Sequence, residues 1–139
     1  MMSGSRYNQY LVRAPLDSTS PGVILMNNEA VPGCNVFIMY NWVREKPKPN
    51  PMHAAVEAHD YDEIIVNIGT DPSRPGYLGG EIEGYMGGEK QIITTSSALF
   101  IPRNVEHGRV SWKGFERPHI QMAIKLSGDI KFGPPPKGT

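Results

Sequence analysis

Five ionisable side chains stand immediately before an apolar run in the segment EAHDYDEIIVNIG, which spans Glu57 to Gly69. In an extended strand, side chains two positions apart lie on the same face, so Glu57 and His59 are expected to project to one side. A tight turn through residues 60–62 is expected to bring Glu63 onto the neighbouring strand, facing the same interior. Carboxylate and imidazole groups gathered in this way are typical of a site that binds a metal or moves protons.

A second imidazole follows in the segment IPRNVEHG, residues 101–108. Pro102 is expected to end a strand, and Asn104 is a residue type that tolerates left-handed backbone dihedrals. The spacing therefore predicts that a turn delivers His107 toward the first group of residues.

The two remaining histidines are weaker candidates. His53 lies six residues before His59, about 20 Å along a regular strand, so it reaches the same site only if the strand bends at a bulge. His119 begins the last expected strand and is predicted to lie at the rim of the fold, with only a minor functional role.

Other charged residues have ordinary explanations beside functional ones. Glu81 and Glu83 share a strand face that is expected to be the solvated face of an edge strand. Arg103 could meet a substrate carboxylate, but an exposed salt bridge with a neighbour such as Glu106 is an equally good interpretation.

The elements that must position these residues are predicted to be short strands. The chain contains 15 Gly and 13 Pro, which leave little room for long helices. Runs of β-branched and aromatic residues between turn residues indicate an all-β protein, a sandwich or a barrel. The expected strands are residues 22–26, 35–43, 52–59, 63–68, 80–86, 91–95, 98–101, 109–112 and 119–126.

Composition narrows the class of protein. The 139 residues are expected to form a single domain, 1–139, in which residues 1–6 and 133–139 are flexible tails. The 14 basic and 14 acidic residues balance, so a nucleic-acid partner is not expected. A single cysteine, Cys34, and the absence of an apolar leader or of an apolar stretch long enough to cross a bilayer predict a cytoplasmic protein that does not bind membranes.

Two segments together resemble the paired motifs of the cupin superfamily, usually written G-x5-H-x-H-x3,4-E-x6-G and G-x5-P-x-G-x2-H-x3-N. The first reads Pro51-x5-Glu57-x-His59-x3-Glu63-x5-Gly69 in this chain, and the second reads Ser96-x5-Pro102-x-Asn104-x2-His107-x3-Ser111. Most departures from the motifs affect turn residues and spacing. The departure that affects chemistry is Glu57, which stands where the family has its first histidine ligand.

The resemblance implies a cupin-type double-stranded β-helix, a jelly-roll barrel that holds a divalent metal ion of iron, manganese, nickel or zinc. His59, Glu63 and His107 match the family's ligand positions. Glu57 is a substituted fourth position, open to three interpretations: a direct ligand, an acceptor that orients a histidine, or a general base. The alternative to a metal is that His59 and His107 only form hydrogen bonds around an empty or water-filled cavity.

The function implied by the resemblance is that of a metal-dependent enzyme acting on a small organic molecule inside the barrel, of the oxygenase or the metal-assisted isomerase or cyclase type, with Glu57 or Glu63 moving a proton. The alternative is a non-catalytic module that binds a small molecule. A homodimer is also expected, because the segment NVFIMYNWV offers strand edge and apolar surface. The core or cavity wall is predicted to include Phe37, Met39, Phe100, Trp112 and Met122.

Overall fold

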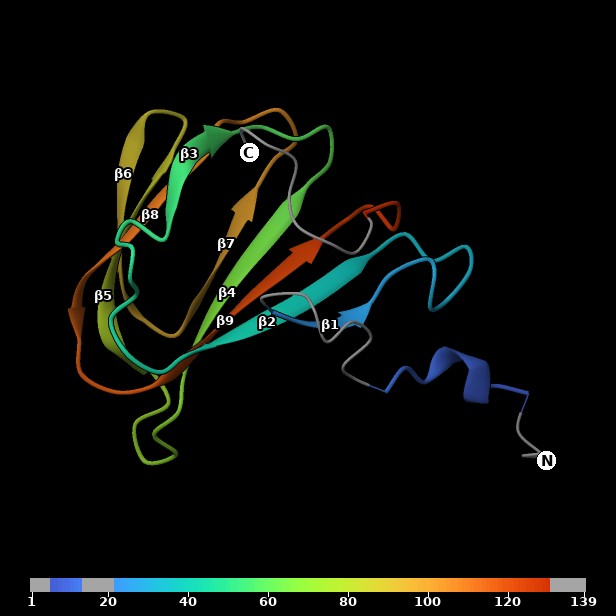
Figure 1. Cartoon of the computed structure of the whole chain (residues 1–139), viewed down its shortest axis with the longest axis horizontal. Helices are drawn as coiled ribbons and strands as arrows, with labels where there is room; N and C mark the ends of the chain where they lie inside the picture. The colour runs from blue at the N-terminus through green and yellow to red at the C-terminus, as the bar shows by residue number, and fades with distance from the viewer. Residues whose placement is uncertain (1–5, 14–21, 131–139) are drawn as a thin grey trace.

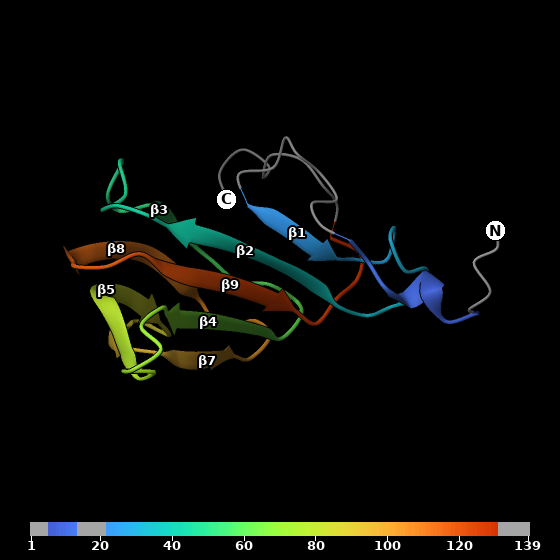
Figure 2. The same cartoon turned by 90° about the horizontal axis from the view of Figure 1, so that it is seen from below.

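Nine strands form two antiparallel sheets in a computed structural model that describes residues 6–13 and 22–130. The five-stranded sheet has the order β1-β2-β9-β4-β7, and the four-stranded sheet has the order β3-β8-β5-β6 (Figures 1 and 2). A 3-10 turn, η1, covers Asn8–Tyr10. The strands are β1 Val23–Met26, β2 Phe37–Val43, β3 His53–Glu57, β4 Glu63–Gly69, β5 Tyr77–Met86, β6 Glu89–Thr95, β7 Ser97–Ile101, β8 His107–Phe115 and β9 His119–Lys125.

The all-β jelly-roll architecture predicted from the sequence is confirmed, and each expected strand has a counterpart. Two boundaries differ at positions that matter for the site. β3 ends at Glu57, so His59 lies in the connection that follows it. β8 begins at His107, so this residue starts a strand instead of lying in a turn. The reason is tertiary, because His107 pairs with Glu57 on one side and with Met86 on the other.

The connection after β3 crosses from one sheet to the other. β3 pairs with β8 in the four-stranded sheet, whereas β4 pairs with β7 and β9 in the five-stranded sheet. The expectation that Glu63 lies on the strand next to His59 is therefore wrong. Glu63 faces the same interior from the opposite layer, where it is in register with Lys125 and Ile101.

The core at one end of the interior is formed by Val43, Leu78, Ile82 and Trp112, none of them more than 3% exposed. His119 lies there too and is fully buried, so its predicted place at the rim is wrong. The Trp112 indole N–H donates to Nε2 of His119 at 3.0 Å, and Nδ1–H of His119 donates to the Arg117 carbonyl at 2.9 Å. Both ring nitrogens are thus engaged, and burial lowers the pKa of His119, so the ring stays neutral.

Two further expectations are corrected by the strand order. The strand that contains Glu81 and Glu83, β5, lies between β8 and β6, so it is not an edge strand. Glu83 lies near the ammonium groups of Lys90 and Lys113 and accepts a hydrogen bond from Tyr85. β2 lies between β1 and β9, so the segment NVFIMYNWV offers no free strand edge.

A separate correction concerns the predicted core. Phe37 and Trp112 are buried as expected, but Phe100 is 51% exposed. Phe100 alternates along β7 with buried Ile101, so it points away from the interior. The predicted tails 1–6 and 133–139 lie outside the described residues, apart from Arg6, and the single-domain organisation stays a prediction.

Candidate metal centre

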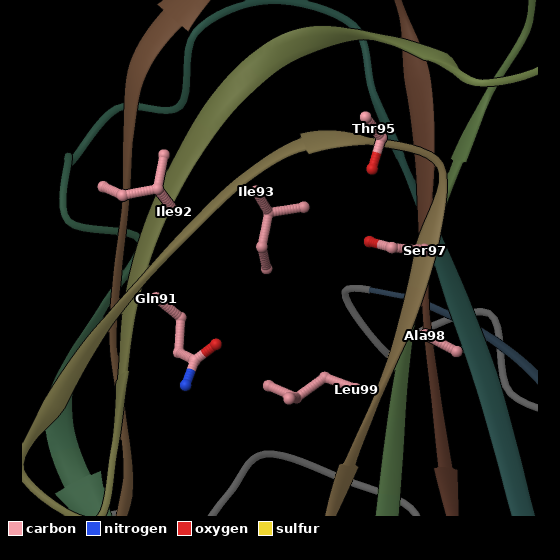
Figure 3. A pocket seen from close by; sticks show the side chains of 7 residues that line it. All are labelled: Gln91, Ile92, Ile93, Thr95, Ser97, Ala98 and Leu99. Carbon is pink, nitrogen blue, oxygen red and sulfur yellow. The ribbon is translucent and has the colours of Figure 1, made fainter.

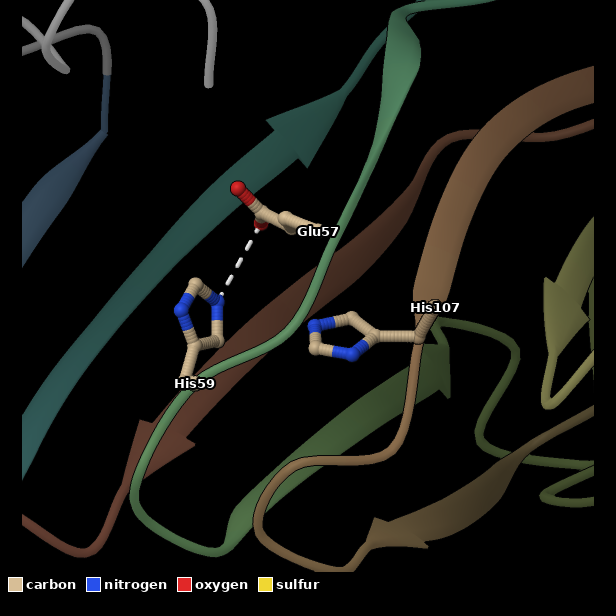
Figure 4. A group of neighbouring side chains, drawn as sticks. All are labelled: Glu57, His59 and His107. Atoms are coloured by element: carbon tan, nitrogen blue, oxygen red, sulfur yellow. Dashed lines mark ion pairs between the residues drawn. The ribbon is translucent and has the colours of Figure 1, made fainter.

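Side chains from three segments of the chain lie close together. Glu57 is the last residue of β3, His59 follows it, and His107 begins β8 (Figure 4). Nε2 of His59 lies 3.3 Å from Oε1 of Glu57. One potential ligand atom from each of Glu57, His59 and His107 lies within 4.8 Å of the other two. The expected gathering of these three residues is therefore present.

Glu63 reaches the same point from the opposite sheet. Its Oε1 atom lies 3.3 Å from Nε2 of His107 and 3.7 Å from Nε2 of His59. The Glu63 side chain is only 6% exposed, whereas that of Glu57 is 36% exposed. The two carboxylates thus differ in environment, since one is enclosed by protein and the other borders solvent.

Three atoms at this point are buried without a hydrogen-bond partner: Nε2 of His59, Oε1 of Glu63 and Nε2 of His107. Leaving such atoms unsatisfied costs about 1–3 kcal/mol each, so a native protein normally gives them a partner. Ligand atoms bonded at about 2.1 Å to one metal ion lie about 3.0–3.4 Å apart in octahedral or tetrahedral geometry. The separations of 3.3 Å between His107 and Glu63 and between His59 and Glu57 fit such a centre.

The orientation of His107 suits a residue that binds a metal ion. Its Nδ1–H donates to the Val105 carbonyl at 3.0 Å, which leaves the Nε2 lone pair directed toward Glu63 and His59. Backbone carbonyls commonly fix metal-binding histidines in this way. His59 is held by stacking on Tyr61, with the ring centroids 4.8 Å apart and the planes 3° from parallel.

Hydrogen bonds join the connection after β3 to the turn that precedes β8. The Asn104 N–H donates to the His59 carbonyl at 2.7 Å, and the Arg103 N–H donates to Oδ1 of Asp62 at 2.9 Å. Asn104 has φ 66°, the left-handed conformation that its residue type predicted. These bonds fix the entry of the chain into β8 and therefore the position of His107.

Neighbouring charges shift the pKa values of Glu63 and His107. Burial raises the pKa of Glu63, but the interaction with His107 and the positive charge of Lys125 outweigh it, so the pKa is lowered overall. The interaction with the Glu63 carboxylate raises the pKa of His107 against the opposing effect of burial. Both shifts favour an ion pair between Glu63 and His107 in the metal-free protein.

Sequence reasoning missed two residues close to this centre. Burial and the charges of Glu63 and Glu57 raise the pKa of Tyr61 to about 12, so its hydroxyl stays protonated and can donate a hydrogen bond. The position of Tyr61 between His59 and Glu63 in the sequence could have indicated that it lies close to the candidate metal centre. Lys125 is in register with Glu63 on the inner face of β9, a placement that no sequence pattern reveals.

The remaining predicted residues lie elsewhere. Arg103 is exposed, with Nε 3.8 Å from Oδ1 of Asp60, which supports the salt-bridge interpretation with a different partner from Glu106. His53 begins β3, at the other end of the strand from Glu57, and the ladder shifts register between His53 and Val56. The side chain of His53 lies outside the described features, so its participation stays a prediction.

An open pocket lies between the edge strands of the two sheets. A pocket of about 210 Å³ opens between β6 and β7, and side chains of both strands point into it (Figure 3). Ser97 and Leu99 of its wall are in register with Asn67 and Ile65 of β4. The lining residues of the pocket all belong to β6 and β7. Its wall comprises Gln91, Ile92, Ile93, Thr95, Ser97, Ala98 and Leu99.

Comparison with known proteins identifies the fold. No protein-family model and no curated protein matches the sequence. Among solved structures, an RmlC-like cupin from Shewanella frigidimarina is similar over 93% of this chain and 94% of its own, with TM-score 0.51 and 14% identity. The chain thus has the cupin fold, and the resemblance noted in its two motifs is confirmed at the level of the fold.

Two further similar structures are of an epoxidase and an iron protein. Hydroxypropylphosphonic acid epoxidase from S. wedmorenis matches 75% of this chain with TM-score 0.50 and 13% identity. The iron(II) form of HppE matches 75% of this chain with TM-score 0.51 and 14% identity. The chain spans about half the length of these two, 49% and 48% respectively.

Within the described residues, no helix is long and apolar enough to cross a membrane.

Proposed function

We propose that this protein is a metal-dependent enzyme that transforms a small organic molecule in the interior of its cupin fold. The observation that carries the proposal is that Oε1 of Glu63 lies 3.3 Å from Nε2 of His107 and 3.7 Å from Nε2 of His59, while all three atoms are buried and lack a hydrogen bond of good geometry. Two imidazoles with a carboxylate and open positions are the ligand set of many non-haem iron(II) sites. The similarity to the iron(II) form of HppE supports the same class of metal.

His59, Glu63 and His107 would hold the ion, and Glu57 is placed to be either a fourth ligand or a proton acceptor. A set with one or two carboxylates favours iron(II), manganese(II), nickel(II) or zinc over copper(I). When bound, the ion supplies Lewis-acid polarisation of a substrate oxygen or redox chemistry with dioxygen, which fits an oxygenase or an isomerase or cyclase.

The chain's own residues supply positioning and proton transfer. Glu57, whose side chain is 36% exposed, can exchange protons with solvent and accept one from a substrate beside His59. The Tyr61 hydroxyl, kept protonated by its raised pKa, can donate a hydrogen bond to a developing negative charge on the substrate. Lys125, on the inner face next to Glu63, favours a substrate that carries an anionic or electron-rich oxygen.

Metal analysis and spectroscopy of the full chain test the proposal. Protein purified without chelator should contain about one divalent ion per chain, and Glu63→Gln should lose it. Iron(II)-loaded protein exposed to nitric oxide should give the electron paramagnetic resonance spectrum of a high-spin iron nitrosyl, which reports an open coordination position. A metal-loaded protein that binds no nitric oxide would argue against the oxygenase type and favour the isomerase or cyclase type. Absence of stoichiometric metal, with small-molecule binding retained, would instead support the non-catalytic binding module.

The cytoplasmic location and the absence of a nucleic-acid partner stay predictions.

A further inference from the structure

The inner face of the five-stranded sheet changes in character between the candidate metal centre and the packed core. Residues in register on β2, β9, β4 and β7 form rows across this face, and every second residue of a strand belongs to the next inward row. One row contains Glu63, and the third row beyond it contains buried Val43 and His119. The two rows between them are Met39-Ala123-Ile65-Leu99, here called the apolar row, and Asn41-Gln121-Asn67-Ser97, here called the amide row.

The amide row has a buried donor that the protein does not use. Asn67 is only 1% exposed, and its Oδ1 atom accepts a hydrogen bond from Nε2 of Gln121 at 3.1 Å. Among the described residues, this is the one hydrogen bond made by either of these two side-chain amides. A buried amide donor normally has a partner, because leaving it unpaired costs free energy. Nδ2 of Asn67 is therefore available to a bound molecule.

The interior is accessible as far as the amide row. All four residues of the apolar row are partly exposed, whereas Val43 and His119 beyond the amide row are at most 3% exposed. Leu99 of the apolar row and Ser97 of the amide row both line the open pocket, and Gln91 of β6 points toward Leu99 across it (Figure 3). The pocket thus connects solvent with both rows.

The opposite sheet has a glycine at the matching level. Gly84 lies on β5 between Ile82, which belongs to the core, and Met86, which is in register with His107. Gly84 pairs with Gln91, so a side chain at Gly84 would point to the same inner face. Among the described residues, a Cβ atom there would meet one heavy atom within 4 Å, Cγ2 of Val110 at 4.0 Å. The inner face is therefore open at Gly84, and a larger side chain would project into the interior.

We propose that the substrate is an elongated molecule with an oxygen group at the metal, an apolar middle on the apolar row, and a neutral amide or hydroxyl group at the amide row. This inference rests on the proposed function, because it describes the far end of the same substrate. Asn67 follows Glu63 by four residues on β4, which is about 13 Å along a strand.

The residue types of the amide row define the group that fits there. Nδ2 of Asn67 donates and Oε1 of Gln121 accepts, so a group that both accepts and donates satisfies the two together. The amide row contains no charged residue, so a carboxylate or ammonium group would lose water there without gaining a counter-charge.

Hydroxamic acids that differ only at their far end test the proposal in the zinc-loaded full chain, because a hydroxamate group chelates metal ions. Straight-chain hydroxamates of butano to octano length, ending in a methyl, a primary amide or a carboxylate group, would be compared by calorimetry. At the best length, the amide end should bind about tenfold more tightly than the methyl end, which is the effect of one good hydrogen bond. Equal affinities of these two ends at every length would overturn the proposal.

Two variants assign the preference to the amide row. Asn67→Leu has a similar volume and should reduce the preference for the amide end to about twofold or less, with unchanged metal content. Ser97→Ala changes an exposed residue, so it should fold normally and weaken the amide-ended probe severalfold while the methyl-ended probe binds as before. A preference that survives in both variants would contradict the assignment.

A filling variant and a matched control complete the set. Gly84→Leu should weaken the long probes whatever their end group and leave butanohydroxamate unaffected. Thr94→Ala is the control, because Thr94 is exposed and alternates along β6 with the pocket residues Ile93 and Thr95. Equal loss of long and short probes in Gly84→Leu would argue against a ligand that extends along the interior.

A measurement without metal separates this inference from the proposed function. In chelator-treated protein, hexanamide should shift the side-chain amide resonances of Asn67 and Gln121 in nuclear magnetic resonance spectra, and hexanoate should not. Absence of these shifts would overturn the inference whether or not the protein binds metal. Shifts in a protein that binds no metal would support the amide row as a binding site and contradict the proposed function alone.

Discussion

Oε1 of Glu63 lies 3.3 Å from Nε2 of His107, although the two residues begin strands of opposite sheets. Glu63 starts β4 in the five-stranded sheet, and His107 starts β8 in the four-stranded sheet. Their contact therefore forms only when the two sheets pack together. Assembly of the candidate metal centre therefore depends on correct packing of the two sheets.

Removal of an imidazole should strongly weaken metal binding without unfolding the protein. We expect His107→Ala and His59→Ala each to weaken metal affinity about 100-fold or more, since even partners of the ligands contribute 10–100-fold. Metal content after dialysis, measured by mass spectrometry, checks this. Glu106→Ala is the matched control, because Glu106 is exposed one residue before His107. Unchanged stoichiometry in both histidine variants would contradict the site.

The ion pair between Glu63 and His107 should make the metal-free protein sensitive to pH. The raised pKa of His107 means that its stabilisation is complete below its ordinary value of 6.5 and is lost as pH rises through the folded-state pKa. The lowered pKa of Glu63 means that its stabilisation is present above 4.5 and is lost as pH falls through the folded-state pKa. Nuclear magnetic resonance titration of chelator-treated protein should place the His107 pKa above 6.5. Glu63→Gln should lower it, and an unmoved pKa would argue against the pair.

Glu57 is expected to set the metal preference of the centre. Glu57→His replaces a carboxylate by a neutral imidazole, which raises the charge of the loaded site by about one unit and favours borderline ions such as zinc or copper. Competition among metals, compared between wild type and variant, measures the shift. Glu57→Gln separates loss of charge from gain of a nitrogen ligand. Identical orders of preference in all three proteins would place Glu57 outside the set of ligands.

Asn104 should be replaceable by glycine but not by valine. Its φ of 66° is easily adopted by glycine, whereas a β-branched residue there costs about 1–3 kcal/mol. Asn104→Val should therefore lower the free energy of unfolding and, by shifting the turn that leads to His107, weaken metal binding. Asn104→Gly should retain both. Denaturant unfolding and metal titration give the two readouts, and equal behaviour of the two variants would show that the turn does not depend on this conformation.

His119 should behave as a structural histidine. His119→Leu removes the acceptor of the buried Trp112 indole N–H, which should cost about 1–3 kcal/mol of stability. Metal stoichiometry should stay unchanged, in contrast to His59→Ala and His107→Ala. The lowered pKa of His119 also predicts that its stabilisation is present above pH 6.5 and is lost as the pH falls below that value. Loss of metal in a folded His119→Leu protein would contradict this assignment.

The amino-acid sequence determined the local properties of this protein. Glycine and proline spacing with β-branched runs predicted the strands, because strand formation depends on residue type and on turns that are local in the chain. The two motif segments predicted Glu57, His59, Glu63 and His107 as candidate ligands for the same reason, because residue types and short spacings can be read from neighbouring residues. The left-handed conformation of Asn104 was likewise a property of its own residue type.

Only the tertiary structure decided which sheet each strand joins and which face of each strand is inside. Strand pairing depends on contacts between residues far apart in the chain, so the sequence could not show that Glu57 and Glu63 lie in opposite sheets. The same pairing buries His119 beside Trp112 and turns Phe100 outward, although aromatic type alone predicted both Trp112 and Phe100 for the interior. The alternation of a strand fixes two faces, and which of them is covered depends on the packing of the whole chain.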